Sequence, residues 1–421
     1  MKQLHQNLIK LWFSDAAYAA ASAVSTGSVF SAFLMHGGMT EGQIGLYLSI
    51  TQLVNLAVSL LFAGAAANTR DTRKPLLLLG TLSAAIIALH LCFCFSEIGG
   101  GIAYSLILLL GCLQAAVTAL RTVFIYKLPC EVMDLRYYSL YAGYQGLFTG
   151  AAGIGIGFVL PLFFERFSFA AVNAAAFVFA GICAVISAIL LRILAPLTDG
   201  ETNPKDTASS DKKGISMIAD LRRLLHNRLF MRLLLPNILR GFGTGLISIF
   251  PVVVLREQIL SEQSASLLTA GTYIGTLFSC FAYVFCVKRL GVPKTCLLGG
   301  VLFSIICLTL FGGTTFCLVL YTLAYVGFNI VCCAVPDLIY RSVGSDLISI
   351  FQTWRLTMTQ LGVVLASALF GLLIEWTAGI LIVLIGVICY LICAGCYYLV
   401  FKNNTEFGIE NRKKGTENED L

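Results

Sequence analysis

Long apolar runs separated by short polar segments repeat along the whole chain. A transmembrane helix needs roughly 20 mostly apolar residues to cross about 30 Å of hydrocarbon, and twelve runs come close to or exceed that length. The predicted spans are 9–35, 43–66, 75–95, 101–126, 139–164, 168–195, 229–255, 264–287, 295–311, 314–340, 347–374 and 378–401. We therefore expect an all-α membrane protein with twelve transmembrane helices in two pseudo-symmetric six-helix bundles.

Composition supports this assignment. Of the 421 residues, 58% are hydrophobic and only 12% are charged, whereas soluble proteins have about a quarter charged residues.

Most of the 28 Lys and Arg residues fall in the segments that share one side with the N-terminus. Because cytoplasmic loops hold an excess of these residues, both termini are expected in the cytoplasm and the protein in the cytoplasmic membrane. The net charge of +6 follows from this topology, so no nucleic-acid partner is expected.

A polar segment divides the chain in two. The stretch "APLTDGETNPKDTASSDKKG" begins at residue 195 and contains no apolar run, which is typical of a linker. The predicted domains are therefore an N-terminal bundle over 1–195, a cytoplasmic linker over 196–228, a C-terminal bundle over 229–401 and a cytoplasmic tail over 402–421.

The two halves contain weak internal repeats. Residues 139–165 align with 349–375 without gaps, and "MTEGQIGLY" at 39–47 pairs with "LSEQSASLL" at 260–268. Both short segments begin a helix at a Thr or Ser, and Thr40 with Gln43 has the spacing of a capping box. Repeats in separate halves favour a protein built from two related bundles.

Two six-helix halves joined by a polar linker resemble the major facilitator superfamily over nearly the whole chain. The family signature between helices 2 and 3, G-x-x-x-D-R-x-G-R-R, is partly kept in "GAAANTRDTRK", which retains Gly64, Arg73 and Lys74. Between helices 8 and 9, "VKRLGVPK" keeps Arg289 and Gly291. Positive-inside charge alone would also explain the basic residues. The resemblance implies structural or gating roles for these positions.

The fifth span contains closely spaced glycines. "GLFTGAAGIGIG" at 146–157 is similar to the helix-5 signature of antiporters in the superfamily, but Ala151 replaces its proline. Antiport is therefore not supported. Gly150 and Gly153 are instead expected to let another helix approach closely.

In the seventh span, "GFGTG" at 241–245 indicates either a soft point where the helix bends or tight packing.

Polar residues within the spans recur at helical spacing. Such stripes mark either an interior cavity or hydrogen bonds between helices. They comprise Asp15, Tyr18, Ser22 and Thr26 in the first span, Gln114, Thr118 and Arg121 in the fourth, Asn237, Arg240, Thr244 and Ser248 in the seventh, Tyr321, Tyr325 and Asn329 in the tenth, and Arg355 in the eleventh. Resemblance to the superfamily implies that helices 1, 4, 7 and 10 line a central cavity. The candidates for binding a substrate are Tyr18, Ser22, Gln114, Thr118, Asn237, Arg240, Thr244, Tyr325, Asn329 and Arg355.

Asp15 and Arg121 lie at similar depths from the cytoplasmic ends of their spans. A pair between them is geometrically possible, and its carboxylate would exchange a proton if opening of the cavity altered the balance between desolvation and the neighbouring cation. The two residues are accordingly candidates for proton coupling. A fixed ion pair that holds helices 1 and 4 together is the alternative.

Other classes of function lack their motifs. The four histidines are widely separated and there is no phosphate-binding loop, so no ATP use, cofactor, bound metal or enzymatic activity is expected. The fifteen cysteines are interpreted as free thiols that pack as small apolar groups.

We expect a monomeric secondary transporter of a small solute, sugar-like or an organic anion, coupled to protons. Multidrug efflux and a non-transporting membrane sensor are the alternatives.

Overall fold

The computed structural model describes residues 2–62, 69, 71–125, 127–133, 138–195, 226–342 and 345–402. Gly64 lies outside the described residues, as do the predicted tail from 403 onward and the linker over 196–225. Within the described part, twelve helical stretches are long and apolar enough to cross a membrane. Each overlaps one of the twelve predicted spans, so the predicted all-α membrane fold is confirmed.

The N-terminal half supplies six of the spans. Its helices are α1 (Lys2–Ser25), α2 (Gly27–His36), α3 (Glu41–Leu61), α5 (Arg73–Leu89) continued by η1 (His90–Phe93), α6 (Gly101–Ile125), the short α7 (Leu128–Val132), α8 (Tyr138–Phe164) and α9 (Phe169–Arg192). Helix α1 packs against α8 and α9, and α5 packs against α9 and α6. The first span therefore lies inside this half.

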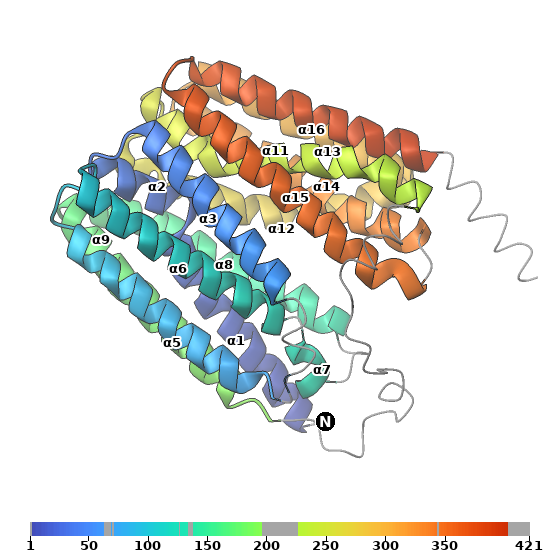
Figure 1. Cartoon of the computed structure of the whole chain (residues 1–421), viewed down its shortest axis with the longest axis horizontal. Coiled ribbons are helices and arrows are strands. Elements are labelled where there is room, and N and C mark those ends of the chain that lie inside the picture. The colour runs from blue at the N-terminus through green and yellow to red at the C-terminus, as the bar shows by residue number, and fades with distance from the viewer. Residues whose placement is uncertain are drawn as a thin grey trace, which may run out of the picture.

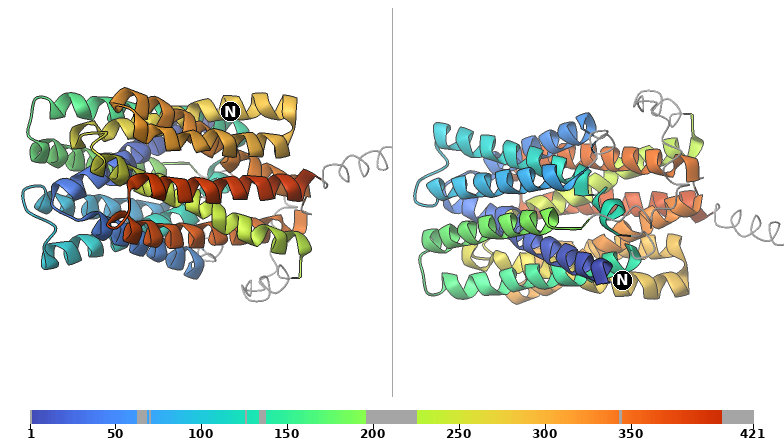
Figure 2. Two further views of the ribbon diagram at one scale, coloured as in Figure 1. Left: turned by 90° about the horizontal axis from the view of Figure 1, so that it is seen from above. Right: turned by 90° about the horizontal axis from the view of Figure 1, so that it is seen from below.

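The C-terminal half repeats this plan. Its helices are α11 (Arg228–Arg256), η3 (Glu262–Ser264), α12 (Ser266–Leu290), α13 (Val292–Phe303) continued by η4 (Ser304–Phe311), α14 (Thr314–Ser342), α15 (Ser345–Ile374) and α16 (Gly379–Lys402). Figures 1 and 2 show the two halves as separate bundles of roughly parallel rods whose helices come together at one end. We call this the closed end; the N-terminus lies at the opposite end (Figure 1).

Local sequence signals set several helix ends. Thr40 forms the predicted capping box at the start of α3, because its side chain accepts a hydrogen bond from the Gln43 N–H while the Gln43 side chain accepts one from the Thr40 N–H. Ser261 accepts a hydrogen bond from the Ser264 N–H before α12. Gly291 ends α12 with φ of +75°, a conformation that favours glycine. The segments paired in the sequence therefore begin their spans with similar caps.

The break in helix geometry occurs in the first span. Gly27 has φ of +71° and separates α1 from α2, so the predicted span 9–35 is two helices. In contrast, α11 runs unbroken through the glycines at 241–245. A Cβ atom on Gly241 would collide with the α15 backbone, and one on Gly243 with the ring of Tyr390. Tight packing, and not bending, explains that glycine run.

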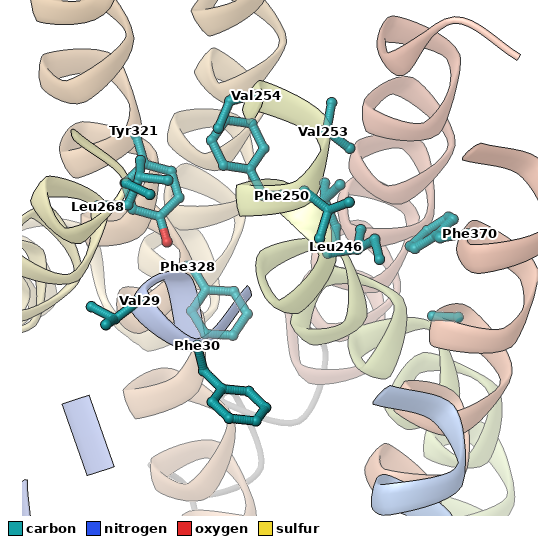
Figure 3. Close-up of a cluster of buried hydrophobic side chains, with 14 of the residues drawn as sticks. Val29, Phe30, Leu246, Phe250, Val253, Val254, Leu268, Tyr321, Phe328 and Phe370 are labelled. Atoms are coloured by element: carbon teal, nitrogen blue, oxygen red, sulfur yellow. The ribbon is translucent and has the colours of Figure 1, made fainter. Parts of the chain in front are cut away.

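The hydrophobic core is shared between the halves at the closed end. One cluster of buried side chains joins residues from both halves, among them Phe30 of α2 and Phe250 of α11. Figure 3 shows Val29 and Phe30 of α2 beside the part of this cluster that holds Leu268, Phe250 and Tyr321. The Phe250 and Tyr321 rings stack with centroids 5.0 Å apart. Burial of apolar surface therefore helps to hold the closed end together.

The predicted orientation can be tested with impermeant thiol reagents. In a background without native cysteines, Lys294→Cys, exposed near the start of α13, should react only in inside-out vesicles. Ser96→Cys, exposed between η1 and α6, should react only from outside intact cells. Reaction of Lys294→Cys in intact cells would reverse the assigned sides.

Candidate functional site

Four helices bring the two halves into contact. Helix α3 packs against α15, and α8 packs against α12. A Cβ atom on Gly45 of α3 would collide with the backbone at Gly371 of α15, and one on Gly153 of α8 would collide with the Tyr273 ring. A Cβ on Gly150 would meet Leu277 at 2.9 Å. The small residues of α8 therefore contact a helix of the other half, a closer approach than larger side chains would permit.

Hydrogen bonds also join the halves at this end. Ser28 Oγ and Thr269 Oγ1 are 2.6 Å apart, and Ser49 Oγ donates to the Val364 carbonyl oxygen at 3.2 Å. Nearer the loops, His36 Nδ1 lies 2.6 Å from a carboxylate oxygen of Glu262. We define the seam as these bonds together with the α3–α15 and α8–α12 packing.

The opposite end of the molecule has a different arrangement. A second hydrophobic cluster, built around Leu8, Leu11 and Trp12 of α1, contains side chains of the N-terminal half alone among the described residues. The helices of the two halves diverge toward this end in Figure 1. The two halves are thus in contact at the seam and diverge toward the end where the N-terminus lies, which we call the open end.

A cavity of about 180 Å³ lies between the halves. Helices α1, α2, α11, α12 and α14 all contribute to its walls. Its lining residues are Ser22, Ala23, Thr26, Gly27, Ser28, Ile247, Ser248, Pro251, Thr269, Thr272, Tyr273 and Tyr321. Eight of these twelve side chains carry a hydroxyl and none is charged, so the cavity offers many neutral hydrogen-bonding groups.

The cavity unites part of the predicted stripes. Ser22 and Thr26 come from the first span, Ser248 from the seventh and Tyr321 from the tenth. The break at Gly27 also borders the cavity. Tyr325 packs beside Tyr321 with ring centroids 6.0 Å apart but is not part of the lining. None of the lining residues comes from the fourth span.

Other predicted substrate residues make contacts within their own half. The Gln114 side chain donates to Ser83 Oγ at 2.8 Å, which links α6 to α5. Asn237 is fully buried and accepts a hydrogen bond from the Tyr397 hydroxyl of α16. Asn329 donates to Thr276 Oγ1 at 3.3 Å. The structure therefore assigns these three amides to contacts between helices and does not bring them to the cavity.

The remaining candidates also lie outside the cavity lining. The carbonyl oxygens of Thr118 and Thr244 accept hydrogen bonds from the hydroxyls one turn later, those of Thr122 and Ser248. Arg240 and Arg355 keep only 8% and 5% of their surface exposed, respectively, and neither lines the cavity. Neither arginine borders this cavity, and the expected role of Arg240 in binding a substrate stays a prediction.

Asp15 is buried and accepts a hydrogen bond of 2.6 Å from the Tyr141 hydroxyl of α8. The Gln145 side chain lies near the same carboxylate. The Arg121 guanidinium lies 3.4 Å from the centroid of the Tyr18 ring. Arg121 is also close enough to Asp15 for its positive charge to act on the carboxylate. Asp15 and Arg121 nevertheless form no ion pair within 4.0 Å, both being described residues. The hydrogen-bond partner of the Asp15 carboxylate is therefore the Tyr141 hydroxyl and not the Arg121 guanidinium.

Besides Asp15 in the first span, the tenth span contains an acid, Asp337, that was not singled out from the sequence. Asp337 follows Pro336 in α14 and accepts a hydrogen bond of 2.7 Å from the Tyr283 hydroxyl of α12. Asp337 and Asp15 are thus both acids within apolar spans, and each accepts a hydrogen bond from a tyrosine of a neighbouring helix. An acid beside a proline inside an apolar run was the available signal.

The loop before α5 holds an acid and a cation in contact. Arg73 Nε donates to Asp71 at 2.7 Å, and Arg73 Nη1 donates to the Leu194 carbonyl oxygen at 2.7 Å. The hydrogen bond from Arg73 lowers the pKa of the Asp71 carboxyl. Lys74 is exposed, and the Arg289 guanidinium lies 4.3 Å from the Phe285 ring centroid. Arg73 thus ties the start of α5 to the end of α9.

Comparison with known proteins identifies the fold. No protein-family model and no curated protein matches the sequence. Among solved structures, the nucleoside transporter NupG is 14% identical, with 96% of this chain and 100% of that chain covered and a TM-score of 0.69. A bacterial homolog of the lysosomal transporter Spinster, in an inward-facing and unoccupied conformation, is 14% identical, with 95% and 96% covered and a TM-score of 0.67.

The xylose transporter XylE from E. coli, in a partially occluded inward-open conformation, is 12% identical, with 94% of this chain and 97% of that chain covered and a TM-score of 0.67. The twelve helices in two related halves therefore have the same fold as these three solved transporters. At these identities the likeness defines the fold, and the activity has to be argued from the chain's own residues.

The seam generates a prediction about Gly153. Gly153→Leu should weaken closure because its side chain would overlap the Tyr273 ring, and overpacking of about 1–3 kcal/mol shifts a two-state equilibrium roughly 5- to 150-fold. The measurement is the rate at which a Ser28→Cys reporter reacts with an impermeant thiol reagent applied from the closed end.

The matched control is Gly155→Leu on the same helix, where an added Cβ has no atom within 4 Å. This variant should leave the reporter as protected as in the parent. Equal labelling of the Gly153→Leu and Gly155→Leu proteins would mean that the α8–α12 packing does not determine closure.

Proposed function

We propose that the chain is a secondary transporter that moves a small polar solute across the cytoplasmic membrane by alternating access. The observation that carries the proposal is the hydroxyl-lined cavity between the halves, next to a seam that closes one end. A site near the midplane between two repeats, reached alternately from each side, is the arrangement that secondary transporters use. The protein acts as a monomer, since each chain contains both halves.

The cavity indicates the kind of solute. Eight hydroxyl side chains and no charged one line it, so a ligand with several hydroxyl, carbonyl or ether oxygens would find both donors and acceptors. Tyr273 and Tyr321 add aromatic surface. A sugar-like solute fits this lining better than a hydrophobic drug, because the hydroxyl oxygens keep free acceptor capacity beyond their bonds within the protein, and only a polar solute would use it.

The direction of opening follows from the predicted topology. If the termini lie in the cytoplasm, the seam closes the outer end and the halves separate toward the cytoplasm. This state would release or collect solute on the inside. Opening of the outer end requires the α3–α15 and α8–α12 contacts to separate while the open end closes.

We further propose that Asp15 carries the coupling proton. Its carboxylate is buried between α1 and α8, hydrogen-bonded to Tyr141, and lies within electrostatic reach of Arg121. Movement of Arg121 toward or away from the carboxylate during opening would change its affinity for a proton. Tyr18, which lies under the Arg121 guanidinium, would move with that change.

The function is tested first by finding the solute. A thermal-shift screen of the purified protein against sugars, organic acids, amino acids and drugs should identify hydroxyl-rich ligands, since a ligand at 100 times its Kd stabilises by about 2.7 kcal/mol. A positive ligand is then followed in proteoliposomes. Saturable uptake by proteoliposomes supports transport, whereas binding without flux would favour a sensor.

A cavity hydroxyl supplies a second test. Thr272 Oγ1 lies 3.1 Å from the Tyr321 hydroxyl in the cavity wall. Thr272→Val keeps the shape but removes the hydroxyl, and a lost hydrogen bond of about 0.5–1.5 kcal/mol should weaken solute binding roughly 2- to 12-fold. Thr81→Val, on the exposed face of α5, is the matched control. Equal affinities of the two variants would place the solute elsewhere.

Proton coupling is tested at the carboxylate. Asp15→Asn should abolish accumulation driven by a proton gradient and retain exchange of solute for solute, because exchange needs no net proton movement. Glu97→Gln, which neutralises an exposed loop acid, should leave both activities intact. Accumulation by Asp15→Asn under an imposed gradient would make Asp15 a structural contact between α1 and α8.

A further inference from the structure

The C-terminal half contains a buried guanidinium with two nitrogens that have no hydrogen-bond partner among the described residues. Arg240 of α11 keeps 8% of its surface exposed. Its Nε and Nη1 atoms are completely buried and make no hydrogen bond with any residue that the structure describes. Buried polar atoms nearly always have partners, so an exception of this kind calls for an explanation.

Among the described residues, no acid forms an ion pair with Arg240. The groups that act on it electrostatically are Tyr390, Cys393 and Tyr397 of α16 and Cys332 of α14. Both tyrosine hydroxyls already donate elsewhere, Tyr390 to the Phe328 carbonyl oxygen and Tyr397 to the Asn237 side chain. None of these four groups is a carboxylate. A positive charge is thus held in an apolar interior without an opposing charge among them, which is costly.

A second buried cation reaches the same place. Arg355 of α15 is 5% exposed and acts on Tyr397 together with Arg240. Both guanidinium groups therefore lie within electrostatic reach of one tyrosine, in an interior where charges act strongly because water is scarce. An anion beside Arg240 would offset its buried charge.

We propose that the C-terminal half contains a binding site for a small oxyanion, a carboxylate or a phosphate group, centred on Arg240 with Arg355 nearby. The planar guanidinium matches the oxygens of these groups and holds them with charge-assisted hydrogen bonds. The site is formed by α11, α14, α15 and α16 and shares no residue with the lining of the hydroxyl-rich cavity. It therefore holds whether or not the chain transports a hydroxyl-bearing solute.

The test measures binding to the purified full-length protein in detergent. Sodium phosphate or sodium succinate replaces sodium chloride at constant ionic strength and pH, and the Tm is recorded. Saturable stabilisation by phosphate alone indicates a phosphate ligand, and stabilisation by succinate alone indicates an organic carboxylate; either result supports the site. If the oxyanions stabilise no more than chloride does, the proposal is wrong.

Variants connect the effect to Arg240. Arg240→Met should abolish the response to the oxyanion, while the Tm of the ligand-free variant should equal or exceed that of the parent because an unpaired buried charge has been removed. Arg289→Met removes an exposed guanidinium at the end of α12 and should retain the full response. An unchanged response in Arg240→Met would overturn the assignment.

A conservative variant keeps the test decisive if Arg240→Met does not fold. Arg240→Lys retains the charge but lacks the planar set of donors, and it should bind the stabilising anion at least about tenfold more weakly. Affinity equal to that of the parent in a folded Arg240→Lys protein would contradict a site built on the guanidinium. Absence of flux in proteoliposomes bears on the proposed transport and leaves this result unaffected.

Discussion

The arrangement of this protein depends on how closely helices of opposite halves can approach. At Gly45 and Gly371 the backbones of α3 and α15 meet with no room for a Cβ atom, and at Gly153 the α8 backbone meets an aromatic ring of α12. Because dispersion contacts fall off steeply with distance, such packing is strong when closed and is lost abruptly when the helices separate. Contacts of this kind favour two discrete states over a continuous range of openings.

The internal repeats found in the sequence coincide with this seam. The longer repeat pairs the segments that form α8 and α15, and the shorter one pairs the starts of α3 and α12. These four helices make the most extensive contacts between the halves, and α2 adds contacts with α11 and α12. Similar packing demands on equivalent helices explain why residual likeness is concentrated there, since small residues and helix caps cannot be exchanged freely at a close crossing.

The sequence predicted the membrane spans and the helix caps well, but it predicted less well which residues contact each other in the folded protein. Apolar run length predicted all twelve spans, and spacing predicted the Thr40 capping box, because both depend on residues close in the chain. Helical spacing placed Ser22 and Asn237 on polar stripes, but it could not show that Ser22 borders the cavity while Asn237 is bonded by Tyr397. Which neighbour satisfies a polar group depends on tertiary packing. The Gly27 break was likewise missed, since the glycine-rich stretch in the seventh span gave the stronger local signal.

The interruption between α1 and α2 also affects the electrostatics of the cavity. Thr26 stands at the N-cap of α2, and its side chain makes no capping hydrogen bond. The first N–H groups of that helix have no partners within the helix, and together they amount to a fractional positive charge. Because residues 26 to 28 border the cavity, main-chain dipoles polarise a chamber whose side chains are all neutral. The oxygen-rich ligands proposed for this cavity would therefore also interact with the backbone, and substitution of the hydroxyl residues would leave that interaction in place.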